Sequence, residues 1–200
     1  TAIKILTNNF HKNRNDILTI SLLGNFHGLN KEFNNAIYFQ KLAIQLAPFE
    51  SVFYLNLSES LRKNDQLDQS LSILYFSKIL SSEDVLIDYK LAKLNTTLKN
   101  FEQSDLIYTG LVKNKNISKD VIISYCDKLI KFNKEDEAIS FIEEYGKNIP
   151  NDDVLQSVIG LAYYKKKQFD LAQKFLLNSI RINNNNSFSH TLLGDCFSAV

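Results

Sequence analysis

Apolar and small residues recur along this chain with a spacing that two distant stretches share. LLGNFHGLNKEFNNA at 22–36 and VIGLAYYKKKQFDLA at 158–172 each place an aliphatic pair before a glycine and an alanine twelve residues after it. The two glycines, Gly24 and Gly160, are 136 residues apart, which is four times 34. A fixed period of 34 residues indicates a repeat architecture, in which each unit buries its apolar face against its neighbours.

The period holds along the whole chain when Ile17 is taken as position 1 of a unit. Position 7 is apolar in every unit, and position 24 is large, with Gln40 as its only polar occupant. Positions 8 and 20 hold only small residues. Position 8 is occupied by Gly24, Ser58, Ala92, Cys126, Gly160 and Gly194, and position 20 by Ala2, Ala36, Ser70, Ser104, Ala138 and Ala172.

This pattern predicts two antiparallel helices in each unit. Positions 4, 7, 8 and 11 share one helical face, and positions 20, 24 and 27 share a face of a second helix. Helices that cross closely need a small residue at the contact, so position 8 is expected to face position 20. No stretch alternates like a strand, and the predicted fold class is therefore all-α, an α-solenoid of antiparallel helix pairs. We predict a single solenoid over 1–200, with units at 1–16 (partial), 17–50, 51–84, 85–118, 119–152, 153–186 and 187–200 (partial).

Short polar residues mark where the first helix of a unit is expected to begin. Asn15, Ser82, Ser118 and Asn151 stand just before these helices, where a polar side chain can accept hydrogen bonds from free amide groups. Polar runs such as LNKE and KKKQ are expected at the corners between the two helices of a unit. The asparagine tract at 183–186 lies at a unit junction and is interpreted as compositional bias.

The spacing resembles that of the tetratricopeptide repeat (TPR) family, whose units place a large residue at position 4, Leu at 7, Gly or Ala at 8, Tyr at 11, Ala at 20, Phe at 24, Ala at 27 and Pro at 32. The first complete unit matches this pattern, while His27 and Gln40 depart from it. Leu111 and Tyr145 replace the small residue at position 27 of later units. Two related repeat families fit the sequence less well. RNA-binding pentatricopeptide arrays have a period of about 35 residues, and Sel1-like units are longer and would need insertions that this chain lacks. The matches in the first and fifth units are Ile20, Leu23, Gly24, Ala36, Ala43, Pro48, Ile159, Gly160, Tyr163, Ala172 and Leu176.

The resemblance implies a right-handed superhelix whose first helices line a concave groove. It also implies a scaffold or interaction module that binds an extended or helical segment of a protein partner there. The positions that packing leaves over form an amphipathic groove, with a basic, partly aromatic strip that should select acidic residues beside aliphatic anchors. The candidate groove residues are Asn25, Leu55, Asn56, Glu59, Arg62, Lys63, Tyr89, Lys90, Lys93, Ile123, Asp127, Leu161 and Tyr164.

Two binding motifs of the family are incomplete in this chain. A clamp for a C-terminal carboxylate finds Asn25, Asn56 and Lys90 at three of its places, but Ser21 and Leu86 stand where it requires lysines. Much of the charge-assisted bonding to the carboxylates would therefore be missing. The ladder of asparagines that holds a peptide backbone in other members is reduced to Asn56 alone.

Composition narrows the function classes further. The net charge is +1, with 23 Lys and Arg against 22 Asp and Glu, so no nucleic-acid partner is expected. No stretch reaches the roughly 18 apolar residues of a membrane span, and no signal peptide is recognised, so a cytoplasmic location is expected. Cys126 and Cys196 have no metal-ligand spacing and are expected to be buried, reduced thiols.

No catalytic motif, metal site or cofactor fingerprint is found, and the chain is predicted not to be an enzyme. His27 and His190 fall on packing positions and are interpreted as core or boundary residues. The chain contains no Met, which predicts a piece of a longer protein. The alternative function is therefore the N-terminal arm of a larger enzyme, such as a glycosyltransferase or sulfotransferase. Uncapped helices at both ends are expected to fray or to associate end to end.

Overall fold

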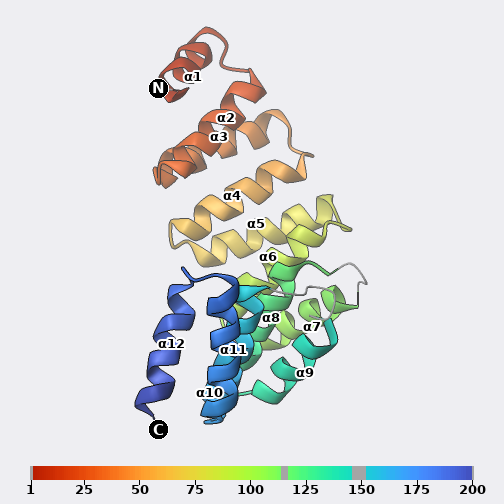
Figure 1. The fold of residues 1–200 in the computed structure, drawn as a ribbon. Coiled ribbons are helices and arrows are strands. Elements are labelled where there is room, and N and C mark those ends of the chain that lie inside the picture. The colour runs from red at the N-terminus through yellow and green to blue at the C-terminus, as the bar shows by residue number, and fades with distance from the viewer. Residues whose placement is uncertain (1, 114–116, 146–151, 200) are drawn as a thin grey trace. The chain divides into compact units, whose positions relative to one another are not determined.

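The computed structural model describes residues 2–113, 117–145 and 152–199. Over these ranges the chain forms α-helices and no strand, which confirms the predicted all-α fold of antiparallel helix pairs (Figure 1). The helices are α1 (Ala2–Lys12), α2 (Ile17–Leu29), α3 (Phe33–Leu46), α4 (Ser51–Lys63), α5 (Leu67–Leu80), α6 (Val85–Thr97), α7 (Phe101–Val112), α8 (Lys119–Lys131), α9 (Glu135–Tyr145), α10 (Asp153–Lys165), α11 (Phe169–Ile182) and α12 (Ser187–Ser198).

The helix starts follow the 34-residue period. The first helices of the units, α2, α4, α6, α8, α10 and α12, begin at Ile17, Ser51, Val85, Lys119, Asp153 and Ser187. The second helices, α3, α5, α7, α9 and α11, begin at Phe33, Leu67, Phe101, Glu135 and Phe169, sixteen residues later in each case.

Small residues make the contact between the two helices of a unit, as the sequence predicts. The Ser58 hydroxyl lies 2.9 Å from the Ser70 hydroxyl, and the Ser70 hydroxyl donates to the Ser58 carbonyl at 2.7 Å. The Cys126 thiol donates to the Ala138 carbonyl oxygen at 3.8 Å. A Cβ atom added at Gly160 would lie 2.7 Å from Leu176 Cγ, so this crossing accepts no side chain without movement. The two helices of a unit approach each other closely at position 8, which explains why that position holds a small residue.

Each corner between paired helices ends the first helix in the same way. One residue per corner has a left-handed backbone, with φ between 57° and 63°, and the next residue donates its N–H to the carbonyl five residues earlier. This is the Schellman arrangement, which satisfies carbonyl groups at a helix C-terminus. The left-handed residues are Lys31, Asp65, Lys99, Asn133 and Lys167, each 34 residues after the last.

The predicted helix caps are partly wrong. Asp16 accepts the hydrogen bond from the N–H of Leu18, and Asp84 accepts one from Leu86, so these aspartates cap the helices in place of Asn15 and Ser82. Ser118 is the cap residue of α8, but its side chain makes no capping bond. Asp152 caps α10, and Asn151 lies outside the described residues. A carboxylate at this position also interacts favourably with the positive end of the helix dipole.

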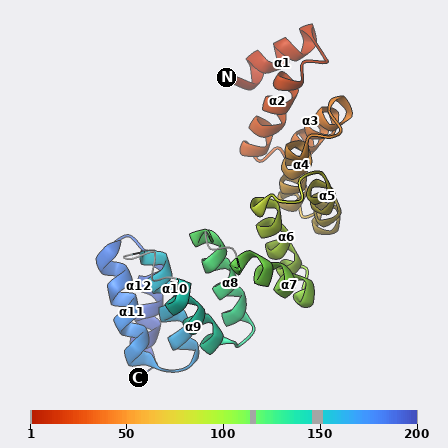
Figure 2. The ribbon, with the colours of Figure 1, turned by 90° about the vertical axis from the view of Figure 1, so that its right-hand side faces the viewer.

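The chain divides into two compact units, Thr1–Ile107 (unit 1) and Tyr108–Val200 (unit 2). In unit 1, helices α2 to α6 pack in sequence, and a core of Leu74, Ile87, Leu91 and Leu94 joins α5 to α6 (Figure 1). In unit 2, α10, α11 and α12 lie side by side (Figure 2). Each unit has its own apolar core.

The histidine and cysteine side chains that the sequence analysis singled out lie in packing or surface positions. His27 is buried, with its Nδ1 2.6 Å from Glu32 Oε2, and its ring stacks on Phe39. His190 is exposed, contrary to the core or boundary position expected, and its Nε2 lies 2.9 Å from the carbonyl oxygen of Asn184, before α12 begins. Cys126 and Cys196 are free and buried as predicted, and burial raises the pKa of both thiols.

None of the helices in the described part of the chain is both long and apolar enough to cross a membrane. Within the same ranges, no group of three or more His, Cys, Asp or Glu side chains is arranged to hold a metal ion.

Candidate functional site

Unit 1 carries two neighbouring pockets on the side lined by its first helices. The first lies between α4, α5 and α6, has a volume of about 220 Å³, and is named the α4–α6 pocket. Its lining residues are Ser58, Glu59, Arg62, Leu74, Tyr89, Lys90, Lys93, Leu94 and Thr97.

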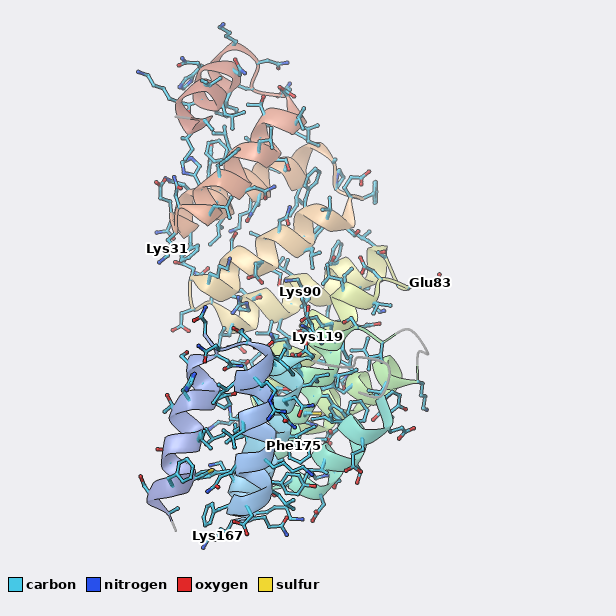
Figure 3. All side chains as sticks on the ribbon, in the orientation of Figure 1. Lys31, Glu83, Lys90, Lys119, Lys167 and Phe175 are labelled. Carbon is cyan, nitrogen blue, oxygen red and sulfur yellow. The ribbon has the colours of Figure 1, made fainter. Side chains whose placement is uncertain are left out.

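Glu59 organises the charged side of the α4–α6 pocket. The Arg62 guanidinium holds its carboxylate with two hydrogen bonds, from Nη2 at 2.7 Å and from Nε at 3.2 Å. Lys90 of α6 donates to the same carboxylate at 3.3 Å, and Lys63 lies 3.5 Å away. Lys90, which is labelled in Figure 3, also forms an ion pair with Glu59 of α4. One carboxylate therefore links two adjacent first helices and fixes the directions of the cations around it.

The same contacts control the ionisation of Glu59. Partial burial opposes its charged form, but the hydrogen bond from Arg62 and the charge of Lys90 outweigh burial and lower the pKa from 4.5 to about 2. Glu59 is therefore ionised at any physiological pH. Its depressed pKa means that the folded chain gains stability above pH 4.5 and loses that gain as the pH falls through about 2.

This linkage gives a first prediction. Glu59→Gln should lower the free energy of unfolding by about 1 kcal/mol at pH 7, a value limited by solvent screening of a partly exposed pair. The difference from the unaltered chain should shrink as the pH falls from 4.5 toward 2. Urea unfolding over this pH range measures it. Glu102→Gln, at an exposed glutamate without an ion pair in the described residues, is the control and should change stability by less than about 0.5 kcal/mol. If the difference in free energy of unfolding between Glu59→Gln and the unaltered chain stayed constant with pH, that result would contradict the role given to Glu59.

The rest of the α4–α6 pocket combines an apolar floor with excess positive charge. Leu74 of α5 and Leu94 of α6 form the floor, and the ammonium group of Lys93 lies 5.3 Å from the centre of the Tyr89 ring. No ion pair of Lys93 is found among the described residues. Three cations against one carboxylate leave the lining with a net charge of +2. The pocket therefore suits a ligand that carries both an apolar and an anionic group.

A second pocket, the α2–α4 pocket, lies between α2, α3 and α4 and has a volume of about 250 Å³. Its lining contains three carboxamide side chains, from Asn25, Gln40 and Asn56. Glu59 borders both pockets. The lining residues are Asn25, Gly28, Leu29, Gln40, Asn56, Glu59, Ser60 and Lys63.

The structure places most of the candidate groove residues of unit 1 at these pockets. Glu59 lines both, and only Leu55 instead packs against the core between α5 and α6. Binding by these residues remains a prediction. The candidates brought together are Asn25, Asn56, Glu59, Arg62, Lys63, Tyr89, Lys90 and Lys93.

The candidates of unit 2 lie in a different setting. Ile123 and Leu161 are half-buried and pack against the core of α8, α9 and α10. Tyr164 packs against the core of α10, α11 and α12, with its ring 5.8 Å from that of Phe169. Asp127 is exposed. None of the four lines the α4–α6 pocket, the α2–α4 pocket or the pocket formed by residues 167–171, and their role in binding also remains a prediction.

Sequence reasoning missed the residues that form the pocket floors. It assigned binding to first helices alone, whereas Leu74 and Gln40 reach the pockets from the second helices α5 and α3. A signal existed for Gln40, because it is the only polar residue at position 24. No comparable signal marks Leu74, whose residue type suits a core position equally well.

Comparisons with known proteins identify the fold. No family model and no curated relative matches the sequence. The structure of YrrB, described as a TPR protein with an unusual peptide-binding site, is 16% identical, with a TM-score of 0.63 over 93% of this chain and 96% of its own. The chain has a TPR fold.

Two further structures share this TPR fold at low identity. MamA is 16% identical, with a TM-score of 0.69 over 86% of this chain and 93% of its own. A chain of the APC/C hetero-tetramer Cut9–Hcn1 is 13% identical, with a TM-score of 0.77 over 98% of this chain. The present chain covers only 39% of that longer chain. The helix pairs of the TPR fold are therefore shared with these structures although very little of the sequence is shared.

Proposed function

We propose that this chain is a protein-interaction module that binds an extended or helical segment of a partner on the first-helix side of unit 1. The observation that carries the proposal is the α4–α6 pocket, with an apolar floor of Leu74 and Leu94 beside Lys90 and Lys93. An aliphatic anchor next to an acidic side chain has the complementary chemistry. The peptide-binding site in the description of YrrB, which has the same fold, supports this reading.

The arrangement of charges explains why the partner segment should be acidic. Glu59 already neutralises part of the charge of Arg62 and Lys90, and it holds both side chains in place. Lys93 projects from the same helix as Lys90, one turn further on. A partner carboxylate at this point gains charge-assisted hydrogen bonds from cations whose positions are already fixed, which reduces the entropy lost on binding.

The other functional expectations fit this proposal but remain predictions. They are a role without catalysis, no nucleic-acid partner, a cytoplasmic location and self-association through terminal helices. On α12, the Phe197 side chain is 62% exposed, which is compatible with a further contact there. The similar structures do not support the alternative of an arm of a larger enzyme.

A peptide-display selection on the immobilised 200-residue chain tests the proposal. We expect the selected peptides to combine Asp or Glu with Leu, Ile, Val or Phe within a few residues. The double variant Lys90→Glu, Lys93→Glu should bind these peptides at least tenfold more weakly, as measured by fluorescence anisotropy. Arg62 is left intact in this variant because it holds Glu59.

A matched control keeps the change in net charge the same. Lys12→Glu, Lys41→Glu alters two exposed lysines of unit 1 that line neither pocket, and it should leave peptide affinity within about twofold. Equal loss in both double variants would point to a general effect of charge. Selected peptides without acidic residues, or unchanged binding to the Lys90 and Lys93 variant, would refute the proposed site.

A further inference from the structure

The α2–α4 pocket contains a buried polar group without a partner. Gln40 is only 4% exposed, and its Oε1 atom has no hydrogen-bond partner among the described residues. Leaving a buried carbonyl oxygen unbonded is unfavourable, because the group has lost its hydrogen bonds to water and gained nothing in return. The same side chain lines a pocket of about 250 Å³.

Gln40 also occupies a place where packing alone favours an apolar residue. Position 24 is large and apolar in the other units, and Leu176 fills it in the unit of α10 and α11 with no exposure. A Cβ atom at Gly24 would lie 3.0 Å from Gln40 Cγ, so the glutamine fits closely against α2. An apolar side chain of similar length would fill this space without an unbonded oxygen. Stability therefore gives no reason for a glutamine here, and ligand binding gives one.

The lining of the pocket indicates which group would bind. The carboxamides of Asn25, Gln40 and Asn56 offer both donors and acceptors, and Ser60 adds a hydroxyl. A carboxylate has no hydrogen to donate to Gln40 Oε1. An ammonium group would meet the positive charge of Lys63 at the pocket wall, and Glu59, the carboxylate of this lining, is already paired with Arg62 and Lys90. A neutral group that donates and accepts in one plane satisfies the lining best.

We infer that the α2–α4 pocket is a specificity site for a carboxamide side chain, of Asn or Gln, in the bound partner segment. The inference rests on the proposed function, because it assigns this pocket to the same partner that the α4–α6 pocket binds. Glu59 borders both pockets, so the two sites are neighbours on α4. The partner segment would then place a carboxamide beside its acidic and aliphatic residues.

The competing explanation is that water satisfies Gln40. A pocket of about 250 Å³ has room for about eight water molecules at roughly 30 Å³ each. A tightly held water that bonds Gln40 would be part of the fold, and removing the oxygen would then destabilise the chain. A ligand site makes the opposite prediction for stability.

Two variants and two matched peptides separate these explanations. Gln40→Met removes the carboxamide with little change of shape. Gly28→Leu leaves Gln40 in place but fills the pocket, since a Cβ atom at Gly28 meets only ordinary contacts at 3.8 Å. The peptides are tripeptides of alanine with a central glutamine in one and a central glutamate in the other, and both have an acetylated N-terminus and an N-methylamide C-terminus, so that neither terminus offers a primary carboxamide. Nitrogen-15 NMR follows the Gln40 side-chain amide and the backbone amides of α4 and α6.

We expect the glutamine peptide to cause saturable shifts of the Gln40 side-chain signal in the unaltered chain. Its affinity should fall at least fivefold in both variants, while the thermal unfolding midpoint of Gln40→Met stays equal to or above that of the unaltered chain. The glutamate peptide should instead shift amides near Lys90 and Lys93 and should bind both variants equally.

Three results would overturn the inference: no saturable shift of the Gln40 signal, equal responses to the two peptides at Gln40, or a lower unfolding midpoint for Gln40→Met. Failure of the glutamate peptide at Lys90 and Lys93 would count against the acidic partner proposed above. The carboxamide site would stand in that case if the glutamine peptide still bound and both variants weakened it.

Discussion

Ala172→Leu should lower the free energy of unfolding by about 1 to 3 kcal/mol, because it forces a large side chain into a closed helix crossing. Ala172 is fully buried on α11, and its carbonyl oxygen lies 3.5 Å from the point where Gly160 would carry a Cβ atom. Leu176 already fills the remaining space beside Gly160. The added atoms can be accommodated only if α10 and α11 separate. Urea unfolding followed by circular dichroism measures the loss.

Gly160 and Gly194 both occupy position 8 of a unit but have different surroundings, so they make a matched pair for substitution. A Cβ atom at Gly160 would lie 2.7 Å from Leu176 Cγ, whereas one at Gly194 meets nothing within 4 Å. Gly160→Ala should therefore destabilise the chain. Gly194→Ala, in the interior of α12, should stabilise it by about 0.5 to 1 kcal/mol through helix propensity. The same sign for both substitutions would show that backbone preference, and not the helix crossing, determines this position.

The sequence was sufficient to predict the helix pairs because their packing repeats. Small residues stand at the two positions of Ser58 and Ser70 in every complete unit, so five weak signals support one conclusion. Helix caps were harder to predict from the same period. Asn15 and Ser82 are residue types that can cap a helix, but they lie one and two residues before the actual caps, Asp16 and Asp84. Only the backbone geometry distinguishes the two candidates at each helix start.

The corners show a similar limit. Left-handed backbone is favourable for glycine and tolerated by asparagine and aspartate, yet three of the five corner residues are lysines. Side-chain preference alone gives no reason to place φ near 60° at Lys31, Lys99 or Lys167. The short connection between antiparallel helices imposes this conformation, and the Schellman hydrogen bond offsets part of its cost.

The candidate site was predictable only where the first helices form it. Groove positions on α4 and α6 do line pockets, because residues that do not pack must face outward. Glu59 was expected as one of the groove residues, and its central place among Arg62, Lys63 and Lys90 depends on side-chain directions that spacing does not specify. Gln40 was visible as a departure from the repeat pattern, but its unbonded oxygen required the packed structure.

Asn186 was interpreted from the sequence as part of a biased tract, but it has a structural role at the junction of α11 and α12. Its Oδ1 atom accepts the hydrogen bond from the N–H of Ser189 at 3.1 Å and so caps α12. Its Nδ2 group lies 3.0 Å from Asp153 Oδ2 and 3.1 Å from each of two serine hydroxyl oxygens, of Ser157 and Ser179, and its two hydrogens are shared among these three acceptors. The tract therefore contributes a defined contact between α10, α11 and α12.

The serines that Asn186 reaches form a buried triangle with Ser189. Their hydroxyl oxygens lie 2.6 to 3.0 Å apart, and all three residues are nearly inaccessible to solvent. Each hydroxyl has one hydrogen to donate, and the Ser157 hydroxyl donates to the Asp153 carbonyl at 2.8 Å. Donors from Asn186 complete the network. Without them, buried oxygens lose partners that water cannot replace.

Asn186→Ala should therefore lower the free energy of unfolding by about 2 to 4 kcal/mol, combining a lost cap with a partly unsatisfied buried network. Asn183→Ala is the matched control in the same tract. Asn183 is exposed, donates to Asp153 at 2.9 Å and accepts from the N–H of Asn185 at 3.1 Å, and because both bonds are open to water its loss should cost no more than about 0.5 to 1 kcal/mol. Urea unfolding compares the two, and amide hydrogen exchange should show faster opening of α12 in the Asn186 variant.

A second substitution separates the cap from the network. Asn186→Asp keeps an oxygen that can accept from the Ser189 N–H, but it removes the Nδ2 donor and sets a carboxylate against that of Asp153. If the network matters more than the cap, this variant should be at least as unstable as Asn186→Ala at pH 7. Near-normal stability of Asn186→Asp would mean that capping accounts for the whole effect. In that case the serine triangle would be stable without the asparagine, because its hydroxyls would satisfy one another.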